Sequence, residues 1–193
     1  ILKNNINKKD KDEDLDIESI ISNNLYENIE SYYDKDLSNI KVNFPWWLKI
    51  FNFFIIIFLK IIFSIFYLLR VEGKGKLKPK GPYLICPNHT SYLDGFCIMT
   101  ALPFKVILQT YFLGLSDIFE SAFLRRFIKN FRLIPIDTRI NPVEALKACS
   151  FVLRNSKVVC YFPEGQRSVD GKIKRFKKGA GILIKELDME VIP

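Results

Sequence analysis

The chain contains a single histidine, and an aspartate follows it at a spacing that could build a proton-transfer site. His89 and Asp94 lie in Asn-His-Thr-Ser-Tyr-Leu-Asp at residues 88–94, directly after an apolar run. On one continuous helix, residues five apart point about 140° away from each other and would not meet. They can meet if His89 lies on the loop after a strand and Asp94 lies in the first turn of a helix, with Ser91 as its N-cap.

A pair of this kind has a defined chemistry. A carboxylate that accepts from one imidazole nitrogen fixes the tautomer and raises the basicity of the other nitrogen. The pair can then act as a general base that takes a proton from a hydroxyl, and it needs no Ser or Cys nucleophile. The competing interpretation is a structural His–Asp pair at a loop, or a chance spacing.

A second candidate cluster follows another apolar run and has the sequence Phe-Pro-Glu-Gly-Gln-Arg-Ser at residues 162–168. Its proline and glycine predict a sharp turn at the carboxyl end of a strand, where ligands bind in α/β folds. The guanidinium of Arg167 suits a phosphate, and Glu164 could pair with Arg167 and orient it. A β-turn with a surface ion pair would explain the same residues. The basic stretch at residues 172–178 is either an anion-attracting rim or a solvated face.

A third cluster, at residues 131–139, places Arg132 and Arg139 at the two ends of a predicted strand. Either arginine could reach a phosphate, which a guanidinium binds well. A structural role of Asp137 and Arg139, in a helix cap or a surface pair, explains this cluster equally well.

The elements that must position these clusters alternate along the chain. Turn signals and apolar periodicity predict strands at 83–86, 105–108, 131–136, 157–162 and 190–192, and helices at 92–101, 116–129, 142–155 and 176–187. Strands that alternate with helices imply an α/β fold, with a mixed, largely parallel sheet flanked by helices.

An almost wholly apolar segment, residues 45–70, precedes this domain and begins with two tryptophans. On a helix, its few polar residues share one stripe about 120° wide. The segment is long enough to cross a bilayer, but a lysine near its middle would then cost about 3 kcal/mol. The pattern favours an amphipathic helix in the membrane interface, with a spanning helix and a buried core helix as the alternatives.

Charge divides the chain. Residues 1–44 carry 6 basic and 10 acidic side chains, whereas the rest carries 23 and 11, so a net −4 precedes a net +12. A basic surface attracts phosphate, whether on nucleic acid, anionic lipid or a metabolite.

The four dispersed cysteines indicate buried thiols in a reducing compartment. We divide the chain into an acidic leader or linker (1–44), a membrane-associating segment (45–70) and an α/β domain (71–193) that we expect to be truncated at its C-terminus.

The order of these motifs resembles the glycerolipid acyltransferase family, the group of bacterial-type 1-acylglycerol-3-phosphate and glycerophosphate acyltransferases. The resemblance rests on His-x4-Asp, the Ile-Pro-Ile-Asp segment at 134–137, Phe-Pro-Glu-Gly-x-Arg-Ser and the final Val-Ile-Pro, and it covers about residues 71–193. It implies transfer of a fatty acyl group from acyl-CoA or acyl-carrier protein to a lysophospholipid hydroxyl, most simply that of 1-acylglycerol-3-phosphate, in phospholipid biosynthesis.

The resemblance also implies roles for single residues. His89 would act as the base and Asp94 would orient it. Glu164, Gly165 and Arg167 would hold the acceptor phosphate, and Ser168 and Arg139 complete the expected substrate-binding set. No metal and no bound cofactor are implied. The partners are membrane lipid and the acyl donor, with no nucleic acid, and the active site would face the cytoplasm.

One departure from the family's pattern concerns the acceptor. Many members have Arg directly after the Asp of the middle motif, whereas here Thr138 stands before Arg139. This leaves glycerol-3-phosphate or another lysophospholipid open as the acceptor. The basic stretch also resembles members fused behind a fatty-acid-activating domain. A membrane-surface binding module without catalysis is the alternative from another class, but it gives no reason for the two motifs together.

Overall fold

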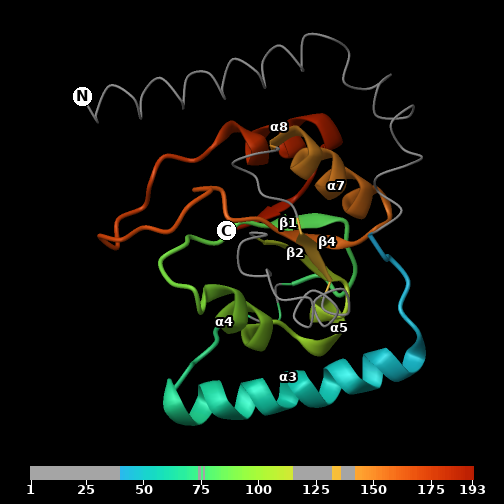
Figure 1. Ribbon diagram of the computed structural model, residues 1–193, viewed down its shortest axis with the longest axis vertical. Coiled ribbons are helices and arrows are strands. Elements are labelled where there is room, and N and C mark those ends of the chain that lie inside the picture. Colours follow the sequence, from blue (N-terminus) through green and yellow to red (C-terminus); the bar gives the residue numbers. More distant parts are fainter. Residues whose placement is uncertain (1–39, 74, 76, 115–131, 136–141) are drawn as a thin grey trace.

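A parallel sheet between two layers of helices forms the centre of the molecule (Figure 1). We analysed a computed structural model, which describes residues 40–73, 75, 77–114, 132–135 and 142–193. The strands are β1 (Tyr83–Ile85), β2 (Thr110–Gly114), β3 (Leu133–Pro135), β4 (Val158–Cys160) and β5 (Val191–Ile192). Their order is β3-β2-β4-β1-β5, and every pairing between them is parallel. The α/β fold class predicted from the sequence is therefore confirmed.

Helices cover both faces of the sheet (Figure 1). One face carries α7 (Pro142–Arg154) and α8 (Lys178–Leu187). The other face carries α4 (Asp94–Ala101), α5 (Phe104–Ile107) and the long α3 (Trp46–Phe66).

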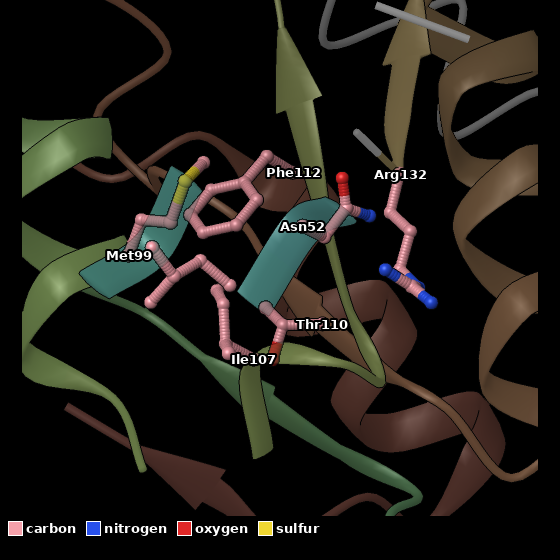
Figure 2. A pocket seen from close by; sticks show the side chains of 7 residues that line it. Asn52, Met99, Ile107, Thr110, Phe112 and Arg132 are labelled. Atoms are coloured by element: carbon pink, nitrogen blue, oxygen red, sulfur yellow. The ribbon is translucent and has the colours of Figure 1, made fainter. Parts of the chain in front are cut away.

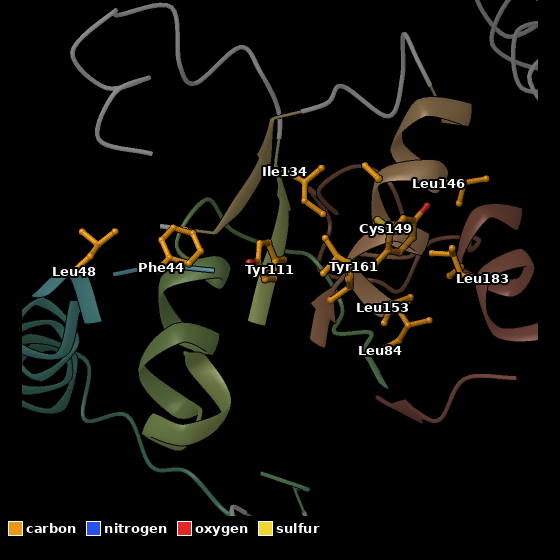
Figure 3. Packing of buried hydrophobic residues seen from close by; sticks show 14 residues of the cluster. Phe44, Leu48, Leu84, Tyr111, Ile134, Leu146, Cys149, Leu153, Tyr161 and Leu183 are labelled. Carbon is orange, nitrogen blue, oxygen red and sulfur yellow. The ribbon is translucent and has the colours of Figure 1, made fainter. Parts of the chain in front are cut away.

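The strands contribute side chains to the hydrophobic clusters on both faces of the sheet, because successive side chains of a strand point to opposite faces. Leu84 and Val159 pack with α7 and α8, whereas Tyr83, Ile85 and Val158 pack with α4 and α5. Figure 3 shows the first of these clusters, in which Tyr161 and Leu153 are surrounded by side chains from the strands and both helices.

The predicted strand at 105–108 is wrong. These residues form α5 and its C-cap, and the strand starts at Thr110. Pro103 caps the helix, and its carbonyl accepts from the N–H groups of Val106 and Ile107 at 2.9 and 3.0 Å. A short buried apolar run fits a helix as well as a strand, so periodicity alone could not separate the two.

The other described elements of the α/β domain agree with their predicted positions to within about two residues, whereas α3 ends at Phe66, four residues before the end of the predicted segment. The predicted helix at 116–129 lies outside the described residues, and so do most of the acidic leader, Asp137 and Arg139. The last leader residues pack on the domain, because Phe44 is buried in the core and the Tyr111 hydroxyl donates to the Lys41 carbonyl.

The helix α3 lies along the domain. Two of its polar residues, Lys49 and Ser64, are exposed to solvent, and the other two lie against the domain. Asn52 is buried, and the ammonium of Lys60 donates to the Leu102 carbonyl at 3.0 Å, so these two polar side chains face the protein. The opposite side exposes large apolar side chains, among them Ile50, Phe51, Phe54, Ile57, Phe58, Ile61 and Ile65. Length and composition alone would also let this helix cross a membrane. A helix that directs Asn52 and Lys60 inward and a broad apolar face outward fits a membrane-associated segment.

Candidate active site

Two loops leave the sheet side by side at the carboxyl ends of β1 and β4. These strands are neighbours in register, with Ile85 opposite Cys160. The loop after β1 carries His89, and the loop after β4 carries the Pro-Glu-Gly turn. Parallel neighbours open at the same edge of a sheet, which is the usual ligand-binding edge of α/β folds. Residues 75 positions apart therefore meet, since the His89 N–H donates to Glu164 Oε1 at 2.8 Å.

His89 and Asp94 meet as the spacing predicts. The ring Nδ1 of His89 lies 2.9 Å from Asp94 Oδ2, and Asp94 is the first residue of α4. The same Oδ2 accepts from the backbone N–H groups of Thr90 and Ser91, at 2.6 and 2.8 Å. Ser91 is not the N-cap; that position belongs to Leu93, whose N–H donates to the Ser91 hydroxyl at 3.1 Å. The carboxylate therefore closes the turn between base and helix.

These hydrogen bonds favour the ionised form of Asp94. Burial alone would raise the pKa of Asp94, but the hydrogen bonds from Ser91, His89 and Thr90 outweigh it and hold that pKa below its ordinary value. An ionised Asp94 accepts from Nδ1, so in the neutral imidazole the proton lies on Nδ1 and the lone pair on Nε2. Among the described residues, none forms a hydrogen bond with Nε2, and the His89 side chain is 18% exposed.

The lowered pKa of Asp94 gives a prediction about stability. The interactions of its ionised form are fully present above the ordinary pKa of 3.8 and are lost as the pH falls through the lower folded-state value. We expect the difference in unfolding free energy between wild type and Asp94→Asn to shrink steadily below that ordinary pKa, as measured by urea denaturation over a pH series. An undiminished difference in strong acid would contradict it.

Aromatic stacking fixes the plane of the imidazole. The His89 ring lies on the Phe162 ring, with centroids 4.1 Å apart and planes 25° from parallel. Cys86 begins the same loop, but burial raises the pKa of its thiol to about 11. Since the thiolate is the reactive form of cysteine, Cys86 is a poor nucleophile at neutral pH.

Glu164 joins the two loops through hydrogen bonds to their backbones. Its side chain is 1% exposed, and its two oxygens accept from backbone N–H groups, Oε1 from His89 and Oε2 from Lys174 at 2.9 Å. The anticipated pair with Arg167 is not formed: within the described part of the chain, no ion pair joins the two side chains. Glu164 holds the backbone on which the candidate base and the basic stretch are built.

Arg167 has an aromatic partner instead. Its guanidinium carbon lies 3.3 Å above the centre of the Tyr92 ring, and its carbonyl accepts from the Lys174 ammonium at 2.9 Å. The N–H of the next residue, Ser168, donates to the His89 carbonyl at 2.7 Å. This backbone contact places Arg167 beside the His89 loop.

Gly165 and Ser168 shape the turn. Gly165 has a φ of +66°, which favours glycine, and its N–H donates to the Phe162 carbonyl. The buried hydroxyl of Ser168 lies 2.9 Å from Asp170 Oδ1 and 2.6 Å from the Lys172 carbonyl, inside its own loop. The remaining predicted site residue, Arg139, lies outside the described residues.

Three further residues belong to this site: Tyr92, Phe162 and Lys174. Two of them stood inside the motifs, but aromatic residues carry no pattern that separates a stacking partner from a core side chain. Lys174 was part of the basic stretch, and only its contacts with Glu164 and Arg167 distinguish it from the other lysines.

A cavity elsewhere in the molecule is lined by one of the candidate residues, Arg132. Its lining comes from α3, α4, α5, β2 and the residue before β3: Asn52, Ile56, Met99, Ile107, Thr110, Phe112 and Arg132 (Figure 2). Arg132, a candidate for phosphate binding by sequence, is buried, and its guanidinium lies 4.3 Å from the centre of the Phe44 ring. Its described contacts are thus with the core.

Comparison with known proteins identifies the class of protein that carries this fold. Residues 68–193 match the family model described as Acyltransferase, so the chain belongs to the acyltransferase family. A 1-acyl-sn-glycerol-3-phosphate acyltransferase of Chlamydomonas reinhardtii is 33% identical over 130 residues, and a chloroplastic one of Arabidopsis thaliana is 31% identical over 133. Each alignment covers 66% of this chain, and the chain spans 38% and 35% of the two relatives.

A solved structure shares the fold. The crystal structure of PlsC, the 1-acyl-sn-glycerophosphate acyltransferase of Thermotoga maritima, superposes with a TM-score of 0.53 at 24% identity. The superposition covers 64% of this chain and 47% of that one. This likeness agrees with the α/β architecture described above.

Proposed function

We propose that this chain transfers a fatty acyl group to the free hydroxyl of 1-acyl-sn-glycerol-3-phosphate. The observation that carries the proposal is the His89–Asp94 pair, with its open Nε2, beside the arginine of the second loop. The names of the relatives support the choice of acceptor. Family membership supports the reaction class.

The geometry allows a simple reaction. Nε2 of His89 takes the proton of the acceptor hydroxyl while that oxygen forms a bond to the thioester carbon of the donor. The carbon–sulfur bond breaks, and the proton passes from Nε2 to the departing thiolate. Asp94 stabilises the imidazolium that exists between these steps. The donor is acyl-CoA or acyl-carrier protein, and the step uses no metal or bound cofactor.

We assign binding of the acceptor phosphate to two positively charged side chains. Arg167 offers a planar fork of donors, and Lys174 adds a second cation whose backbone Glu164 holds. A buried carboxylate occupied by two N–H groups is a poor phosphate ligand, so we assign Glu164 to positioning. Gly165 and Ser168 shape the turn, and Arg139 remains an expected contributor.

We further propose that α3 lies in the membrane interface, so that both lipid substrates reach the site from the bilayer, with the active site on the cytoplasmic side. The support is the inward direction of Asn52 and Lys60 and the outward apolar face of α3. An interfacial helix keeps lysine out of hydrocarbon, which a spanning helix would not.

This orientation predicts the effect of two substitutions. Phe54 and Phe58 are 64% and 62% exposed, so Phe54→Ser with Phe58→Ser should leave the fold intact. Each phenylalanine contributes about 2 kcal/mol when buried in an apolar phase, or about 4 kcal/mol for the two, so we expect vesicle binding to weaken about 100- to 1,000-fold. Co-sedimentation with anionic vesicles measures the effect, with Ser64→Ala as an exposed, uncharged control on the same helix. Unchanged binding of the double variant would exclude α3 as the anchor.

An acceptor panel tests the proposed reaction. The full chain is given labelled acyl-CoA or acyl-carrier protein together with 1-acylglycerol-3-phosphate, glycerol-3-phosphate, lysophosphatidylcholine or monoacylglycerol. We expect the highest kcat/KM with 1-acylglycerol-3-phosphate and the lowest with the acceptor that lacks phosphate. Preference for another lysophospholipid would overturn the acceptor, whereas vesicle binding without any transfer would favour a membrane-binding module.

A further inference from the structure

Tyr92 is a solvent-facing aromatic residue whose described contact is with a cation. Its side chain is 65% exposed, so the core does not account for it. The guanidinium carbon of Arg167 lies 3.3 Å above the centre of its ring, close enough for stacking and for attraction between cation and π-system. A contact so close between two loops makes the ring a platform for the arginine.

Stacking leaves the hydrogen-bonding edge of the arginine available. The five N–H groups of a guanidinium lie in its plane, so a ring below one face blocks none of them. Within the described part of the chain, no side chain or carbonyl accepts from this guanidinium. The fork is thus held in place and still open to an anion with two oxygens, such as a phosphate.

The backbone on both sides of this contact is held by other bonds. On the arginine's side, the Lys174 ammonium binds the Arg167 carbonyl and the Ser168 N–H binds the His89 carbonyl. Tyr92 stands between His89 and Asp94 in the turn that Asp94 closes. The Tyr92 ring therefore has a defined position relative to His89. Because the Arg167 guanidinium stacks on this ring, the arginine has a defined position relative to His89 as well.

We propose that Tyr92 is a positioning residue that holds the Arg167 fork for the phosphate of the acceptor. This inference rests on the proposed function, in which Arg167 binds that phosphate. The ring would fix the distance between the phosphate and the hydroxyl at which His89 acts. Without it, the long arginine side chain would have to be ordered at each binding event, at a cost in affinity.

The test compares the acceptor KM, the donor KM and kcat for two substitutions. Tyr92→Leu removes the ring, and we expect the KM for 1-acylglycerol-3-phosphate to rise about 5- to 20-fold, the range of a partly exposed cation–π contact, while the donor KM stays constant. Tyr92→Phe keeps the ring and should restore the acceptor KM. Phe96→Leu, at another exposed aromatic position nearby, is the matched control.

A double-mutant cycle separates positioning from a general structural role. In the Arg167→Ala background, Tyr92→Leu should have no further effect on the acceptor KM, because the residue acts through the arginine. An undiminished effect in that background, or an unchanged KM in the single variant, would overturn the inference. So would an increase in the donor KM equal to that in the acceptor KM.

Binding of a short-chain 1-acylglycerol-3-phosphate, measured by calorimetry without donor, distinguishes this inference from the proposed function. A loss of affinity in Tyr92→Leu that Tyr92→Phe reverses supports the positioning role whether or not acyl transfer occurs. Equal affinities of wild type and Tyr92→Leu contradict it. Failure of wild type to transfer acyl groups, with binding intact, would contradict the proposed reaction alone.

Discussion

Replacement of His89 by glutamine is expected to lower kcat for acyl transfer about 10²- to 10⁴-fold, the usual contribution of a general base. The amide of glutamine cannot take a proton from a hydroxyl at neutral pH. The hydrogen bond from the N–H of residue 89 to Glu164 should persist in this variant, because it involves the backbone and not the ring. Initial rates at saturating donor and acceptor measure the effect.

A matched control keeps this result interpretable. Gln166 is an exposed residue of the neighbouring loop, and Gln166→Ala should have the kcat of wild type. The acceptor affinity of His89→Gln should stay close to wild type. Its unfolding free energy should fall by only about 1–2 kcal/mol, since the substitution removes the stacking on Phe162 and the hydrogen bond to Asp94. Full activity of His89→Gln would exclude this residue as the base.

Replacement of Glu164 by glutamine is expected to damage both stability and catalysis. Two backbone N–H groups point at the two oxygens of a side chain that is 1% exposed. Glutamine offers one oxygen and turns its NH₂ toward the other N–H, which leaves a buried donor without an acceptor. Such a loss costs about 1–3 kcal/mol of unfolding free energy. Since the displaced backbone carries His89 or Lys174, we expect kcat to fall at least about tenfold as well.

The two roles considered for Glu164 predict different results. A ligand of the acceptor would change the acceptor KM and leave the unfolding free energy unchanged. A backbone clamp lowers the unfolding free energy in the absence of any substrate, as urea denaturation would show. Glu164→Asp, which keeps the charge but shortens the reach, should also be destabilised. Wild-type stability of Glu164→Gln would refute the clamp.

The sequence predicted the parts of the site that depend on local spacing. The contact of His89 with Asp94 needs only a loop and the first turn of a helix, and both signals lie within six residues. The sheet class followed in the same way from alternating apolar runs. The exception was α5, where Pro103 starts a helix in an apolar run too short for its period to be recognised.

Contacts between the two loops could not be predicted, because they depend on which strands are neighbours. Only the pairing of β1 with β4 brings Glu164 to the His89 N–H and Arg167 to the Tyr92 ring. The sequence suggested Glu164 and Arg167 as a pair because they are three residues apart. The partners of Glu164 are backbone N–H groups, which nearly every residue has, so the sequence could not indicate which of them the carboxylate binds.

Formation of labelled phosphatidate is the most direct test of the account. The full chain, bound to vesicles, is mixed with labelled acyl-CoA or acyl-carrier protein and 1-acylglycerol-3-phosphate, and the product is followed for wild type and His89→Ala. We expect phosphatidate from wild type and at most a trace from the variant. Equal rates from both proteins, or no product from well-folded wild type with either donor, would contradict it.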